Sequence, residues 1–143
     1  MRVANKRSFI IGLLIVVCVT AYFYFFYTWT PFSELSAQEP YSIELLKGAK
    51  DPIQLTQSDK QKVCTLLASI QVGRKDNRYR ELTGGSYYWF RLTDQKGDAT
   101  LVGGGSGYIL INDNGYHADP EIIEQIDMLW LDYLELYGMN TSF

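Results

Sequence analysis

His117 is the single histidine of the chain, and two carboxylates, Asp113 and Asp119, lie close to it in the sequence. If residues 116–118 form a strand, His117 and Asp119 share one face and Asp113 lies across a hairpin. Such a set can bind a divalent metal ion, but this spacing matches no metal motif, and Asp119 suits a helix cap better. We expect no cofactor. A weak metal site, or an accessory envelope enzyme using this region, is the alternative interpretation.

Residues 103–107 read Gly-Gly-Gly-Ser-Gly, a composition that phosphate-binding loops share. Such a loop also needs a Lys and a Ser or Thr that open a helix, whereas a strand pattern follows here. Ser106 does not match a nucleophile elbow, because Tyr108 stands where a second Gly is required. His117 has no identifiable nucleophile partner for a triad. The sequence therefore predicts a flexible loop between two strands, and we expect no enzymatic activity.

A basic cluster lies in a polar segment, residues 74–85, that predicts a loop: Arg74, Lys75, Arg78 and Arg80. Beyond residue 7 the chain has 10 basic and 16 acidic residues, a net charge of −6, which disfavours nucleic-acid binding. Two interpretations of the cluster remain open. It pairs with the acidic C-terminal helix as a solvated loop, or it contacts anionic lipid head groups or anionic wall polymer.

Residues 86–93 are dense in aromatic and β-favouring side chains and predict a strand. Alternation along a strand places Tyr87, Trp89 and Arg91 on the same face. If no helix covers that face, these residues form a patch that suits a protein partner or a sugar ring, because Tyr and Trp combine flat apolar area with a polar edge. The alternative is that the aromatic residues belong to the core or are scattered over the surface.

Residues 9–29 are uncharged and mainly apolar, and as a helix they would span about 31 Å, the thickness of a hydrocarbon core. Arg2, Lys6 and Arg7 precede the segment, and the next basic residue is Lys47. The positive-inside rule then predicts a cytoplasmic N-terminus and an extracytoplasmic domain. The segment therefore predicts a transmembrane signal anchor with an aromatic belt at its outer end.

A secretory signal cleaved after Ala21 is the alternative to an anchor. Cleavage would leave an exposed aromatic terminus beginning at Tyr22, which favours the retained anchor. Lipidation of Cys18 is disfavoured, because Val17 precedes it where a small residue is needed. With Cys18 in the anchor, Cys64 has no partner for a disulfide, and its apolar helical surroundings predict a small buried thiol.

The remaining pattern predicts an α+β domain. Thr56 and Asp119 are expected to cap two helices, which Gly73 and Gly138 end. Asn114 and Gly115 predict a hairpin turn. Strands are expected over residues 41–47, 53–55, 86–93, 99–102, 108–112 and 116–118. The order β-β-α-β-β-β-β-α predicts an antiparallel sheet with the helices packed on one face.

The predicted organisation has five parts: a cytoplasmic basic stub (1–8), the transmembrane anchor (9–29), a juxtamembrane linker (30–40), the extracytoplasmic domain (41–138) and a C-terminal tail (139–143). We expect a single-pass protein of the cell membrane. Its expected role is that of a non-enzymatic binding module for a protein or a cell-envelope component, reached through the aromatic sheet face or the basic cluster.

Overall fold

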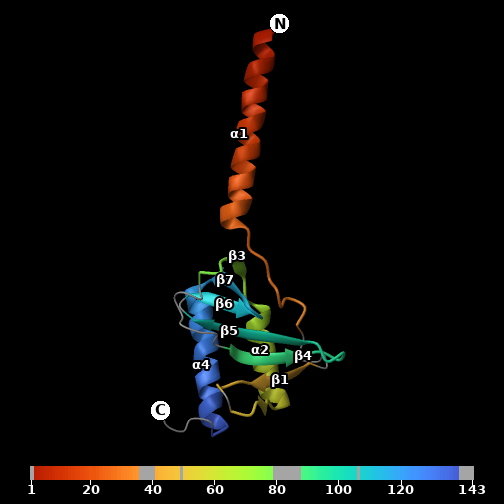
Figure 1. Ribbon diagram of the computed structural model, residues 1–143, viewed down its shortest axis with the longest axis vertical. Coiled ribbons are helices and arrows are strands. Elements are labelled where there is room, and N and C mark those ends of the chain that lie inside the picture. Colours follow the sequence, from red (N-terminus) through yellow and green to blue (C-terminus); the bar gives the residue numbers. More distant parts are fainter. Residues whose placement is uncertain (1, 36–40, 49, 79–87, 106, 139–143) are drawn as a thin grey trace.

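The computed structural model describes residues 2–35, 41–48, 50–78, 88–105 and 107–138 (Figure 1). The long helix α1 (Arg2–Phe26) projects from a domain in which a sheet packs against helices. The described residues of the domain form these elements: β1 (Ser42–Leu45), β2 (Ile53–Gln54), α2 (Gln57–Ala68), β3 (Val72–Lys75), β4 (Tyr88–Thr93), β5 (Ala99–Gly105), β6 (Tyr108–Ile111), β7 (Asn114–Ala118) and α4 (Pro120–Leu136). The predicted α+β class, with an N-terminal apolar helix, is confirmed.

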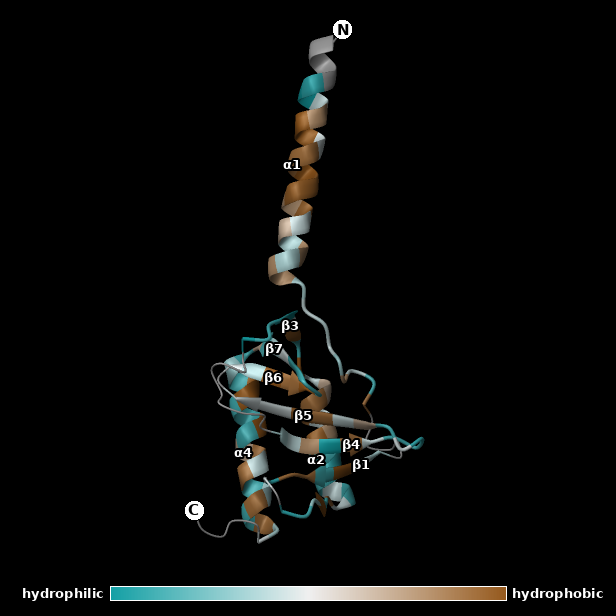
Figure 2. Ribbon diagram, in the orientation of Figure 1, coloured by the Kyte–Doolittle hydropathy of each residue, from teal (hydrophilic) through white to brown (hydrophobic). Residues whose placement is uncertain are grey.

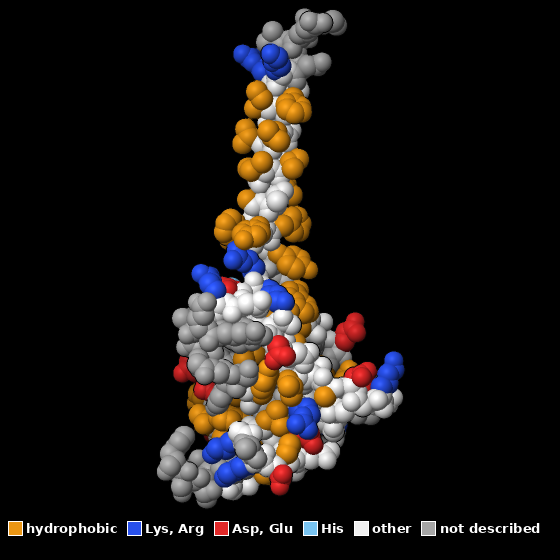
Figure 3. Space-filling model, viewed as in Figure 1, with side chains coloured by type: hydrophobic (Ala, Val, Ile, Leu, Met, Phe, Trp, Pro, Cys, Tyr) orange, Lys and Arg blue, Asp and Glu red, His pale blue; other side chains and the backbone are white. Residues whose placement is uncertain are grey.

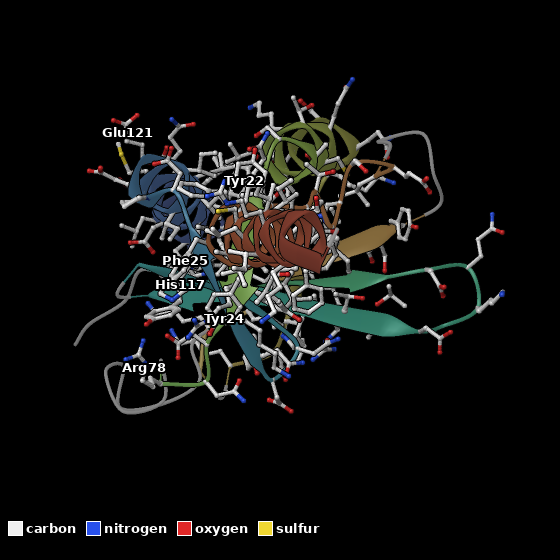
Figure 4. The ribbon with its side chains drawn as sticks, turned by 90° about the horizontal axis from the view of Figure 1, so that it is seen from above. Tyr22, Tyr24, Phe25, Arg78, His117 and Glu121 are labelled. Carbon is white, nitrogen blue, oxygen red and sulfur yellow. The ribbon has the colours of Figure 1, made fainter. Side chains whose placement is uncertain are left out.

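The seven strands form one open sheet in the order β2-β1-β4-β5-β6-β7-β3. Every neighbouring pair is antiparallel. Both α2 and α4 lie on the same side of the sheet, as the view along α1 shows (Figure 4). β2 and β3 are therefore the two edges, and β3 is the edge next to the base of α1 (Figure 1).

The core lies between the sheet and the helices α2 and α4. It is made by inward-facing strand residues and by the apolar stripes of the two helices, among them Ile43, Leu45, Val63, Leu67, Phe90, Ile109, Ile126 and Leu134. Burial of each such side chain contributes roughly 1.5–3 kcal/mol. Trp130 is buried in the same core, and its indole nitrogen donates to the backbone oxygen of Leu46 at 3.0 Å. This bond ties α4 to the end of β1.

Both predicted helix caps are confirmed. The Thr56 hydroxyl accepts from the backbone nitrogen of Asp59, and the Asp119 carboxylate accepts from that of Glu121. The Asp59 carboxylate also accepts hydrogen bonds from the hydroxyls of Thr56 (2.9 Å) and Tyr137 (2.8 Å). Burial by itself raises the pKa of Asp59, but these bonds and the charge of Lys62 lower it overall. An ionised carboxylate thus links the start of α2 to the end of α4.

The strand β3 was not expected from the sequence. The predicted helix end at Gly73 and the predicted loop start at residue 74 are wrong, because α2 ends at Ala68 and β3 continues to Lys75. Residues 79–85 of the predicted loop lie outside the described residues. Val72 is fully buried and pairs with Ala118 of β7. The last two strand residues, Arg74 and Lys75, are charged and exposed, which is typical of an edge strand and resembles a loop in sequence.

The two connections around β6 also differ from expectation. Gly103, Gly104 and Gly105 lie within β5, in register with Leu110, Ile109 and Tyr108, so the strand extends three residues into the predicted loop. The predicted turn at Asn114 and Gly115 is wrong, since both residues pair with β6. The turn lies at residues 112–113, where Asn112 has a positive φ of 53°. The Asn112 side chain accepts from the backbone nitrogen of Leu101 at 3.0 Å, which holds the turn against β5.

Candidate functional site

The chain that leaves α1 covers the edge of the sheet. The last helical hydrogen bond of α1 runs from the Tyr27 nitrogen to the Phe23 oxygen at 3.2 Å. Two residues later, Trp29 exchanges two backbone hydrogen bonds of 2.9 Å with Val72 of β3. The Trp29 ring meets Tyr116 of β7 edge to face, with centroids 5.8 Å apart. Trp29, the last residue of the predicted anchor, thus pairs with the domain and covers an edge strand that would otherwise be open.

Two further residues of the predicted linker belong to the domain. Phe32 and Leu35 are partly buried and pack against the main core. Together with the Trp29 bridge, these contacts hold the base of α1 close to the domain. The end of the domain next to α1 is therefore set in a defined position relative to the helix.

A cavity of about 290 Å³ lies at this junction between α1 and the domain. Its walls come from the last turn of α1 with the residues that follow, and from β3, β7 and the turn after β3: Tyr24, Phe25, Tyr27, Thr28, Gly73, Arg74, Arg78 and His117. Lys and Arg side chains gather where the base of α1 meets the domain (Figure 3). Seen along α1, Tyr24, Phe25 and His117 lie close together, with Arg78 farther out (Figure 4).

Arg74 connects the sheet to α1 directly. Its guanidinium carbon lies 4.9 Å from the centroid of the Tyr24 ring, and its Nη1 donates to the Tyr24 hydroxyl. Stacking of a guanidinium on an aromatic face is favourable and restricts the side chain to one orientation. The arginine is therefore held in place at the pocket wall before any ligand arrives.

Arg78 and His117 share one carboxylate, that of Asp76. Arg78 donates from Nη2 to Oδ2 at 2.7 Å and from Nε to both carboxylate oxygens at 3.1 Å. His117 Nε2 lies 3.1 Å from the same Oδ2. Hydrogen bonds from the Arg78 side chain and backbone hold the pKa of Asp76 well below its usual range. The ionised carboxylate only accepts hydrogen bonds, so His117 carries its hydrogen on Nε2.

The other side of His117 is held by an aromatic ring. The His117 imidazole lies over the buried Tyr108 ring, with a centroid distance of 4.8 Å. Asp76 is held in turn by its backbone, since its nitrogen donates to the Gly115 oxygen at 2.8 Å. The arrangement presents two oriented guanidinium groups and an imidazole around one small cavity. Oriented guanidinium groups bind oxyanions such as phosphate or carboxylate.

We expect the Asp76 contacts to make the protein acid-sensitive. A carboxylate whose pKa is lowered by folding stabilises the folded state above its unfolded value, near 3.8, and this stabilisation is lost as the pH falls below that value. Asp76→Asn should lower the melting temperature at pH 7 and reduce its fall between pH 5 and about pH 3. Thermal melting of the full-length protein in detergent at several pH values measures both effects.

Asp51→Asn is the matched control for this prediction, because Asp51 is an exposed carboxylate outside the pocket. It should leave the pH dependence of melting unchanged. An Asp76→Asn protein with the same acid-dependent loss as wild type would contradict the assigned role of Asp76.

The structure separates the predicted aromatic patch. Trp89 is only 1% exposed and belongs to the core on the helix side, so its predicted position on an open face is wrong. The reason is a β-bulge: Tyr88 pairs with Gly103 and Phe90 with Val102, which leaves Trp89 as an extra residue. The bulge reverses the alternation, and the Trp89 indole donates to Asp127 of α4 at 3.1 Å.

The other predicted binding residues have varied positions. Arg91 lies on the sheet face away from the helices, where it pairs with Glu44 at 3.0 Å. Arg74 and Arg78 line the pocket, and Lys75 follows Arg74 in β3 with an exposed side chain. Two predicted binding residues lie outside the described residues: Tyr87 and Arg80.

The three residues of the hypothetical metal set each have a different partner. His117 contacts Asp76, Asp113 accepts from the Tyr88 hydroxyl at 2.9 Å, and Asp119 caps α4. Within the part of the chain that the structure describes, no three His, Cys, Asp or Glu side chains are grouped so that they could hold a metal ion. The partner of His117, Asp76, was not predicted from the sequence, because it lies 41 residues away. It directly follows β3, a strand that the sequence did not predict.

Comparisons with known proteins add no relative. The chain matches no protein-family model, no curated protein and no solved structure. What the fold and the pocket define is a class: an α+β domain with an antiparallel sheet, preceded by one apolar helix that is long enough to span a membrane or to act as a signal sequence.

Proposed function

We propose that the protein is a single-pass, membrane-anchored binding module that takes a cell-envelope component at the end of its domain nearest the membrane. In this proposal α1 is retained in the cell membrane, its N-terminus is cytoplasmic, and the sheet domain is extracytoplasmic. The domain works by binding rather than by catalysis. Its binding site is the cavity at the base of α1, which we call the juxtamembrane pocket.

The surface of α1 supports the anchor. The stretch Lys6–Phe26 is apolar along most of its length, and the hydrophilic residues gather at its N-terminal end (Figure 2). Most of its large side chains are not packed on the domain: Phe9 is 72% exposed and Phe25 is 73% exposed. In water such a surface is costly, whereas a bilayer of matching thickness covers it. The basic residues that precede it favour a cytoplasmic N-terminus.

The position of the juxtamembrane pocket is the observation that carries the binding role. It combines side chains of α1 with two arginines of the domain, so that an anchored helix necessarily brings the pocket to the membrane surface. Preformed donors around a small cavity are typical of binding sites. The contacts of Arg74 with Tyr24 and of Arg78 with Asp76 favour this interpretation of the basic cluster over pairing with the acidic C-terminal helix.

One labelling experiment in intact cells tests both location and binding. Asn77→Cys places a thiol on the exposed turn beside Arg78, and a membrane-impermeant maleimide that carries a photocrosslinker is then attached. We expect labelling without permeabilisation and, after illumination, one specific crosslinked product. Background from the native thiols should be low. Cys64 is buried with its pKa raised by that burial, and Cys18 lies in the proposed membrane span.

Gln54→Cys is the matched control, because Gln54 is exposed on β2 at the opposite edge of the sheet. It should be labelled equally well and give no such product. Labelling only after permeabilisation would disprove the proposed orientation. Equal products from both positions would mean that the juxtamembrane end has no binding preference.

A further inference from the structure

We propose that the ligand of the juxtamembrane pocket is the phosphate group of an anionic phospholipid in the leaflet that surrounds the base of α1. The inference rests on the proposed function and names the chemistry of its ligand. It follows from three features of the pocket: its level relative to the membrane, its hydrogen-bond donors and its apolar wall.

The level of the pocket relative to the membrane is set by α1 itself. Tyr24 and Phe25 line the cavity and belong to the last turn of the apolar helix, which ends at Phe26. Tyrosine rings are enriched where hydrocarbon gives way to head groups. A pocket that shares these rings opens at the level of the lipid phosphates, so the nearest abundant oxyanion belongs to the surrounding lipid.

The donors of the pocket match a phosphate group. Guanidinium groups present planar N–H pairs that fit phosphate oxygens. Arg74 is held on the Tyr24 ring, and Arg78 is aligned by Asp76 while its side chain stays 70% exposed. The Asp76 side chain is only 5% exposed and both of its oxygens accept hydrogen bonds, so little of its charge faces a ligand. The half-exposed His117 ring lies at the same wall, and its Nε2 faces Asp76 and not the cavity's ligand.

The apolar wall and the size of the cavity suit part of a lipid. Tyr24, Phe25 and Tyr27 line the pocket together with the two arginines. A volume of about 290 Å³ is at the lower end of the range for ligand pockets. A phosphate with its glycerol fits this description, while the acyl chains remain in the bilayer beside α1. An ammonium head group would bring a positive charge toward the arginines, so anionic head groups are preferred over zwitterionic ones.

Lipid selection by the full-length protein tests the proposal. The protein is reconstituted in nanodiscs of phosphatidylcholine with a minority of phosphatidylglycerol, and the lipids that remain bound after mild detergent extraction are identified by native mass spectrometry. We expect enrichment of phosphatidylglycerol by about fivefold for each arginine near the lipid surface. Arg74→Gln should lose part of the enrichment, and Arg74→Gln with Arg78→Gln should lose it entirely.

The matched control removes two cations elsewhere on the domain, Arg91→Gln with Lys96→Gln, and should keep the enrichment. Arg74→Gln leaves the Asp76 pair intact, so it remains informative if the double variant does not fold. A second arm adds inorganic phosphate to the protein in pure phosphatidylcholine nanodiscs and follows its melting temperature.

Each outcome decides the origin of the phosphate. Enrichment that depends on Arg74 and Arg78 supports a lipid ligand. Stabilisation by inorganic phosphate without enrichment of phosphatidylglycerol would overturn the lipid assignment in favour of a soluble or polymeric phosphate. Equal enrichment in wild type and in the Arg74→Gln protein would also overturn it. If the Asn77 crosslink is specific while no lipid is selected, the proposed binding function stands and only the lipid inference fails.

Discussion

Replacing Trp89 by Ala is expected to lower the free energy of unfolding by about 3–5 kcal/mol, the usual cost of removing a fully buried aromatic side chain. The indole fills the space between the sheet and α4 and donates to Asp127, so truncation leaves a cavity and removes this hydrogen bond. Denaturant unfolding or thermal melting of the full-length protein measures the loss. Trp89→Phe should cost less, because it keeps much of the packing and loses mainly the hydrogen bond.

Leu136→Ala is the matched control for truncation, since Leu136 is an exposed apolar residue at the end of α4. It should change stability by less than about 0.5 kcal/mol. If the Trp89→Ala protein were as stable as wild type, the core position of Trp89 would be contradicted. The open sheet face that the alternation in the sequence predicted would then be favoured. The result therefore separates a core role of this residue from a binding role.

Gly104→Ala is expected to cost about 1–3 kcal/mol, although it adds only one methyl group. A Cβ at Gly104 would lie 2.2 Å from Cη2 of Trp89 and 2.8 Å from the backbone oxygen of Tyr108. The indole ring is held by the core and the oxygen by the sheet, so neither can move without strain. In a domain of this size, thermal melting should show a decrease of about 4–8 °C for each kcal/mol.

Gly73→Ala is the matched control, because a Cβ there would find its nearest neighbour, the His117 oxygen, at an ordinary 3.7 Å. It should be close to neutral. A double-mutant cycle adds a second check: Gly104→Ala should cost less in the Trp89→Ala protein than in wild type. Equal costs in both backgrounds would show that the indole does not lie over Gly104.

These predictions concern stability, and they also show which variants are suitable for binding experiments. Trp89 was a candidate binding residue on sequence grounds, and a loss of binding in a Trp89→Ala protein would report unfolding instead of a lost contact. Arg74 has no such complication, since its described contacts are with an exposed ring of α1. Variants of Arg74 therefore give the cleaner test of the pocket.

The sequence alone determined the features that depend on neighbouring residues. The apolar helix, the caps at Thr56 and Asp119, and the buried Cys64 were all predicted, because each follows from contacts within one helix or from one amphipathic face. The fold class followed as well, since runs of strands without helical crossovers favour an antiparallel sheet.

Only the tertiary structure decided where the sheet alternation breaks and which distant residues meet. The bulge at Trp89 reverses the faces of β4, and its position depends on packing against Gly104 and α4. The edge strand β3 looks polar by itself and is defined by its partners, β7 and Trp29. Asp76 and His117 come together only because β3 pairs with β7, and the pocket exists only because the base of α1 closes that edge. Such long-range pairings carry no local signal, because their free energy comes from contacts between residues that are far apart in the sequence.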